Sequence, residues 1–136
     1  MQFTHTLHPR SFFFILLVCS CLIVGCGDRV TVSGRITFPD GEPLTEGSVV
    51  FESENYQAYS YIGADGSYSL GEVEPGDGIR PGEYKIRILA STGGGSDGAP
   101  LVNLVDSKYE STATSGLTCT VKGKMTFGIS VTKPGQ

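Results

Sequence analysis

The sequence has few of the residues that enzymes use most often. It contains no tryptophan and only two histidines among its 136 residues, His5 and His8. Both histidines precede residue 26, where we expect the mature chain to begin. The mature chain therefore has no imidazole general base, no Ser-His-Asp triad and no histidine metal ligand. No spacing of carboxylates indicates catalysis by acids alone, so we predict a non-enzyme without cofactor or metal.

The sequence also lacks an apolar run long enough for a typical membrane-spanning helix. Ser11–Gly25 holds fifteen uncharged residues, whereas a span needs about 20. A short start with Arg10 as its only charge precedes this run. A basic start, an apolar segment and small residues at its end are typical of a secretory signal. We predict that residues 1–25 are a cleaved signal peptide; a retained anchor helix is the alternative.

The end of this run resembles the lipobox of bacterial lipoproteins. Ile23, Val24 and Gly25 precede Cys26 in the order aliphatic, aliphatic or small, small, cysteine. The resemblance implies that the Cys26 thiol receives a diacylglycerol, that the chain is cut just before it, and that the new amino group is often acylated. Ordinary signal peptidase prefers an A-x-A-like end, and no alanine precedes Ala58.

Cysteine is scarce beyond the leader, which bears on the alternative role of Cys26 in a disulfide. Exported cysteines usually pair, but Cys19 and Cys21 would leave with the leader, so only Cys119 would remain. We predict that Cys26 is lipidated. Cys119 alternates with apolar neighbours in "LTCTV", so we expect a buried thiol that behaves as a small hydrophobe.

A lipidated Cys26 would fix where the protein resides. Two acyl chains suffice for stable membrane anchoring, so we expect an exported protein held on a bacterial membrane. Residues 26–29 form a short tether, and the domain should begin within roughly 15 Å of the lipid surface. Loss of Arg10 leaves nine bases against fourteen acids, a formal charge of −5. This balance argues against a nucleic-acid partner and against electrostatic adhesion to anionic lipid.

Seven short segments of the mature chain alternate apolar and polar residues, and Gly, Pro and Asp turns separate them. A period of two predicts strands with one face in a core, and regular alternation favours antiparallel pairing. We predict an all-β, seven-stranded antiparallel sandwich. The predicted strands span residues 30–38, 47–53, 56–63, 67–70, 83–89, 117–121 and 124–131, with Tyr68 and Tyr84 facing inward.

The motifs and their order resemble the carboxypeptidase regulatory-like domains. "VSGRITFPDGEPLTEGSVVF" matches their opening strand, turn and strand, and "ADGSYSL" and "IRPGEYKIRI" match later elements. "DSKYESTATSGLTCTV" is similar to the C-terminal element of small bacterial lipoproteins with this domain. The resemblance covers residues 30–132, leaves 133–136 as a tail, and implies a transthyretin-like (prealbumin-like) Greek-key sandwich.

The same resemblance implies little chemistry. These domains lack a catalytic site of their own. Hydroxyisourate hydrolase, the enzymatic relative with this fold, uses histidines, an arginine and a C-terminal Tyr-Arg-Gly-Ser tail. The present chain has no mature histidine and ends in "VTKPGQ", so none of those catalytic residues is expected here.

Three polar or aromatic groups are candidate binding sites. Tyr56, Tyr59 and Tyr61 are a possible ligand surface for sugars, although tyrosine also suits half-buried strand positions. Asp65–Glu74 weakly resembles a calcium loop, but position six is Leu70 instead of glycine, and a hairpin turn explains Asp65-Gly66. The acids Glu72, Glu74 and Asp77 are interpreted as a solvated loop or as a docking surface for a basic partner.

Together these features predict a non-catalytic, membrane-anchored lipoprotein of the cell envelope. Its expected role is structural or adaptor-like, presenting loops near the lipid surface to an envelope protein. The alternative is a small carbohydrate- or peptide-binding module whose partner would be an envelope glycan or a peptide.

Overall fold

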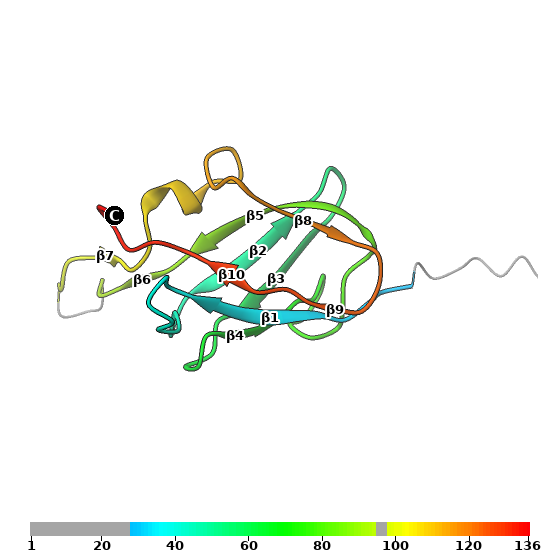
Figure 1. Cartoon of the computed structure of the whole chain (residues 1–136), viewed down its shortest axis with the longest axis horizontal. Coiled ribbons are helices and arrows are strands. Elements are labelled where there is room, and N and C mark those ends of the chain that lie inside the picture. Colours follow the sequence, from blue (N-terminus) through cyan, green and yellow to red (C-terminus); the bar gives the residue numbers. More distant parts are fainter. Residues whose placement is uncertain (1–27, 95–97) are drawn as a thin grey trace, which may run out of the picture.

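The structure, a computed structural model, describes residues 28–94 and 98–136. Within these ranges the chain folds into short strands and one turn of 3₁₀ helix, η1 (Ser107–Glu110). The prediction of an all-β fold is confirmed. Two sheets pack face to face, with the N-terminal residues at one end and a small hairpin at the other (Figure 1).

The larger sheet is antiparallel throughout. Its order is β3 (Gln57–Tyr61), β2 (Ser48–Glu52), β5 (Gly82–Leu89) and β8 (Leu117–Val121). Because side chains alternate between the two faces of a strand, the register of Phe51 opposite Ile86 points both side chains into the core. The predicted inward orientation of Tyr84 is also confirmed, since only 2% of its surface is exposed.

The second sheet corrects the prediction of purely antiparallel pairing. Strand β1 (Val32–Thr37) pairs antiparallel with β4 (Ser67–Ser69), but parallel with β9 (Met125–Thr126) and β10 (Ile129–Ser130). After β8, the turn at residues 122–124 carries the chain to the other sheet, where β9 begins beside the start of β1. Sequence alternation reports which face a residue occupies but not the direction of the neighbouring strand.

The predicted single strand over residues 124–131 is split into β9 and β10. Between them the Phe127 carbonyl accepts a hydrogen bond of 2.6 Å from the Tyr68 hydroxyl. At Gly34 in β1, an added Cβ would collide with this same carbonyl. The close approach therefore requires glycine at position 34. Including the two-residue pair β6 (Ser91–Thr92) and β7 (Val102–Asn103), the described residues contain ten strands.

Phe51 lies at the centre of the core between the sheets. Its ring lies 6.2 Å from Tyr68, 6.1 Å from Tyr84 and 6.4 Å from Phe127, measured between centroids. The predicted inward position of Tyr68 is confirmed, with 4% of its surface exposed. Several connecting segments also contribute fully buried side chains, which the alternation did not predict: Leu44, Ile79 and Val105.

The predicted signal peptide, the lipobox Ile23, Val24 and Gly25, and Cys26 lie outside the described residues. Among the residues that are described, no helix combines the length and apolarity needed to cross a membrane.

Candidate functional site

The first residues of the domain make ion pairs and backbone hydrogen bonds with a loop that is distant in the sequence. Arg29 Nη1 lies 2.7 Å from Asp77 Oδ2, and Arg29 Nη2 lies 3.6 Å from Glu72 Oε2. The next residue, Val30, exchanges two backbone hydrogen bonds with Ile79, at 2.8 and 3.0 Å. The chain is thus held to the domain from the second described residue onward.

Glu72 is the centre of this group, with 8% of its side chain exposed. Its carboxylate lies 3.3 Å from Arg80 Nη1 and accepts a 2.9 Å hydrogen bond from the Arg80 backbone N–H. We call Arg29, Glu72, Asp77 and Arg80 the tether clamp. The interpretation of these acids as a solvated loop is therefore wrong for Glu72, because a buried carboxylate needs paired charges, and two arginines supply them.

The loop that carries the clamp is itself tightly folded. Gly71 exchanges two backbone hydrogen bonds with Tyr59, at 2.9 and 3.1 Å. The Glu72 backbone N–H donates to Asp77 Oδ1 at 2.9 Å. A Cβ added at Gly71 would collide with the Glu74 carbonyl and with the Asp77 carboxylate. Glycine is therefore required where the loop closes on itself.

The predicted tyrosine surface is only partly assembled. Tyr59 and Tyr61 lie together with ring centroids 5.9 Å apart and planes at 85°. Tyr56 makes a different contact, with the Arg80 guanidinium 4.1 Å from its ring centroid. Because the Tyr59 and Tyr61 rings are nearly perpendicular, they do not form one flat platform. Tyr61, 70% exposed, offers the most accessible ring of the three.

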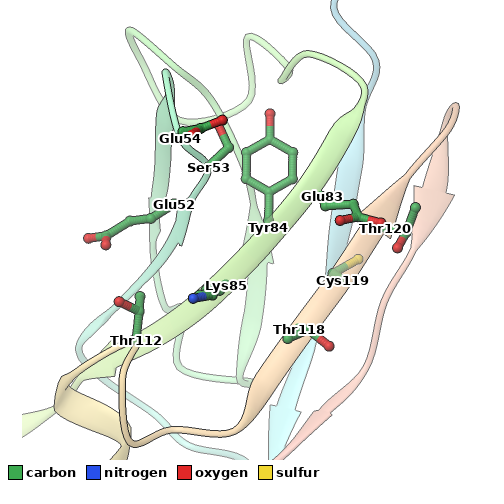
Figure 2. Close-up of a pocket in the computed structure, with 10 residues that line it drawn as sticks. All are labelled: Glu52, Ser53, Glu54, Glu83, Tyr84, Lys85, Thr112, Thr118, Cys119 and Thr120. Carbon is green, nitrogen blue, oxygen red and sulfur yellow. The ribbon is translucent and has the colours of Figure 1, made fainter.

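A groove of about 640 Å³ lies across β2, β5 and β8 (Figure 2). Lys85 lies near its middle, opposite Glu52 on one side and Thr118 on the other. Three carboxylates and one ammonium line it, and the Arg87 guanidinium lies 2.6 Å from the Glu52 carboxylate, so two cations stand against the three acids. The lining residues are Glu52, Ser53, Glu54, Glu83, Tyr84, Lys85, Thr112, Thr118, Cys119 and Thr120.

Cys119 lies in the wall of this groove but faces the core, with 5% of its surface exposed. The prediction of a buried thiol is confirmed. Burial raises the pKa of the Cys119 thiol above its ordinary value, because an apolar environment disfavours the thiolate. The thiolate is the nucleophilic form, so the environment of Cys119 is that of a packing residue.

The segment that resembles a calcium loop begins with a hairpin turn, as expected. The Asp65 carboxylate accepts hydrogen bonds from the hydroxyl and the backbone N–H of Ser67, at 2.5 and 3.0 Å. The hydroxyl contact is the main cause of the lowered pKa of Asp65. Gly66 supplies the positive φ, +81°, that this turn requires. Across residues 28–94 and 98–136, no three His, Cys, Asp or Glu side chains cluster so as to hold a metal ion.

Comparison with known proteins finds similar solved structures but no match by sequence. No protein-family model matches the chain, and no curated protein matches it. A crystal structure of a DUF3823 family protein from Bacteroides ovatus superposes with a TM-score of 0.47 and 20% sequence identity. The superposition covers 78% of this chain and 45% of that one, so the present chain spans less than half of its neighbour's length. A likeness of this size carries no argument about activity.

Proposed function

We propose that the protein is a non-catalytic lipoprotein of the bacterial cell envelope, anchored through fatty acid on Cys26. Its β-sandwich acts as a structural or adaptor module. We assign the sandwich to the carboxypeptidase regulatory-like domains, with a transthyretin-like Greek-key order of seven principal strands. The order of the sequence motifs and the two packed sheets support this assignment.

The tether clamp is the observation that best supports the anchored role. Arg29 follows Cys26 by three residues and is bonded to Asp77 and Glu72. Three extended residues reach about 10 Å. A lipid on Cys26 would therefore hold the clamped end of the sandwich against the membrane surface and direct the opposite end away from it.

Metabolic labelling with an alkyne-bearing fatty acid, followed by membrane fractionation, tests this proposal. We expect the full chain, expressed in a bacterial host, to incorporate the label and to sediment with membranes. Cys26→Ala should abolish labelling, whereas Cys119→Ser, the matched control, should retain it. Equal labelling of the Cys26→Ala variant and the unaltered chain would overturn the proposal.

The exposed ring of Tyr61 favours a second candidate function, binding of an envelope glycan. One aromatic ring beside a second provides an apolar face for a sugar, and phenolic hydroxyls add hydrogen bonds. The protein should then be retained on insoluble envelope polysaccharide, and Tyr61→Ala should reduce retention more than Tyr56→Ala. Unchanged retention of the Tyr61→Ala variant would exclude this candidate.

A further inference from the structure

The chain enters the domain between two segments at the same end of the sandwich. On one side, the Val30 backbone pairs with Ile79 of the loop that carries the clamp acids. On the other side, the Thr31 carbonyl accepts a 3.1 Å hydrogen bond from the Met125 backbone N–H, directly after the turn at residues 122–124. The entry point of the chain is therefore flanked by the clamp loop and by this turn (Figure 1).

Two exposed apolar side chains lie beside the tether clamp. Val73 is 65% exposed and directly follows Glu72, the residue that both clamp arginines contact. Tyr56 is 43% exposed, and its ring centroid lies 4.1 Å from the guanidinium of Arg80, another clamp residue. Single exposed apolar residues are common on protein surfaces, so their position decides what they indicate. Both are connected to the ion pairs that hold Arg29 at the entry point.

The turn on the other side of the entry point carries two cations. Lys122 and Lys124 are exposed, and neither forms an ion pair with an acid in the part of the chain that the structure describes. Lys133 at the far end, by contrast, lies 2.9 Å from Glu42. Lysine has a flexible apolar stem and an ammonium group that binds phosphate as a point charge. The two lysines of the turn are therefore suited to bind phosphate groups.

Acidic residues at the same end determine which lipid this surface fits. Asp28, Glu54 and Glu74 are also exposed there, so this end has no excess of positive charge that would favour an anionic lipid. A zwitterionic phospholipid presents both phosphate and ammonium groups, which complement the lysines and the carboxylates, respectively. Valine and tyrosine suit the same layer, because an apolar side chain can enter it and tyrosine favours the boundary between lipid and water.

We propose that the exposed apolar and cationic side chains around the entry point form a lipid-contact face, which rests on the headgroups of zwitterionic phospholipid. The residues of this face are Tyr56, Val73, Lys122 and Lys124. The inference rests on the proposed function, because Cys26 precedes Arg29 by only three residues, which reach about 10 Å when extended. Contacts on both sides of the entry point would prevent the sandwich from tilting about its tether. The far end would then be held at a fixed height above the membrane.

Fluorescence quenching of the full lipid-modified chain in phosphatidylcholine vesicles tests the inference. A fluorophore is attached to a cysteine introduced by Val73→Cys or, as the matched control, by Val102→Cys at the far end, where the valine is 52% exposed. The vesicles include a phospholipid with a nitroxide quencher on its headgroup. We expect quenching at position 73 to exceed that at position 102 by at least about threefold. Replacing part of the phosphatidylcholine with anionic phosphatidylglycerol should not increase quenching at position 73.

A longer tether separates contact made by the face from proximity imposed by the anchor. Inserting about ten Gly and Ser residues before Asp28 lets the domain leave the surface, yet quenching at position 73 should persist. In this longer chain, Lys122→Glu combined with Lys124→Glu should reduce quenching about threefold. The matched double variant, Lys85→Glu with Lys108→Glu, changes two exposed lysines outside the face and should leave quenching nearly unaltered.

Three outcomes would overturn the inference. These are equal quenching at positions 73 and 102, loss of quenching at position 73 when the tether is lengthened, and equal effects of the two double variants. Stronger quenching with phosphatidylglycerol would also contradict it. Fatty-acid labelling of the same preparation reports separately on the anchor. Labelled protein with equal quenching at the two positions refutes the lipid-contact face alone, whereas unlabelled protein refutes the proposed function and this inference with it.

Discussion

The two ends of the sandwich each carry a cluster of ion pairs, but the clusters differ in burial. At the N-terminal end, Glu72 of the tether clamp has an 8% exposed side chain between two arginines. At the opposite end, Lys133 lies 2.9 Å from Glu42 and 3.5 Å from Asp40. All three side chains of this far cluster are at least 40% exposed.

The difference in burial indicates which end of the sandwich is held more firmly by its ion pairs. Exposed ion pairs contribute little to stability because water and salt screen them, whereas removing one partner of a buried pair leaves an uncompensated charge. We therefore expect the clamped end to be held rigidly and the far end to tolerate change. The far end also bears the exposed apolar residues Leu101 and Val102, at 65% and 52% exposure, on or beside the β6–β7 hairpin.

The largest expected effect comes from closing the space at Gly71. Gly71→Ala should lower the free energy of unfolding by about 2–3 kcal/mol, because its Cβ would collide with Glu74 and Asp77 and open the loop. Gly123→Ala at the same end is the matched control, since a Cβ there meets nothing within 4 Å. Urea denaturation measures both, and equal effects would contradict the described loop.

The second-largest loss of stability is expected from removing the charge of Glu72, at the centre of the tether clamp. Glu72→Ala should cost about 1–2 kcal/mol, moderated because both arginine side chains are 34% exposed. Glu74→Ala, which alters a neighbouring exposed acid, should cost less than about 0.5 kcal/mol. Thermal unfolding of both variants at two salt concentrations checks this order. A reversed order would show that burial does not distinguish the two acids.

The far cluster should respond much less than the clamp. Lys133→Ala removes both ion pairs with Asp40 and Glu42, and exposed pairs contribute little to stability because water and salt screen them. We expect a loss of stability clearly smaller than that of Glu72→Ala, and one that shrinks with added salt. A loss as large as that of Glu72→Ala in the same denaturation assay would remove the contrast between the ends.

The smallest expected effect is a change in how the stability of the fold depends on pH under acid conditions. The backbone N–H of Glu42, with a smaller contribution from Lys133, lowers the pKa of Asp40. A lowered pKa in the folded state stabilises the protein above the unfolded pKa, and this contribution is lost as the pH falls through the folded value. Asp40→Asn should slightly flatten the decline of stability below about pH 4. An unaltered pH profile of the variant would contradict this assignment.

The sequence pattern predicted which residues form strands better than it predicted which strands pair with each other and in which direction. Alternation identified Tyr68 and Tyr84 as inward residues because burial of one face leaves a period of two in the sequence. It carried no signal for the parallel pairing of β9 and β10 with β1, which depends on where the turn after β8 leads the chain.

The candidate site was less predictable for a similar reason. The tether clamp joins Arg29 to Asp77 across 48 positions, and neither residue belongs to a periodic pattern. An arginine next to the lipobox and acids in a Gly-rich loop are the only traces of the clamp in the sequence. Their pairing depends on the loop fold that Gly71 permits.

The intact mass of the native product tests the central claim, lipidation of Cys26, most directly. The account predicts a chain that begins at Cys26 and carries a diacylglycerol, with or without a further acyl group on its amino terminus. A product with an unmodified Cys26, or with residues 1–25 still attached, would contradict it.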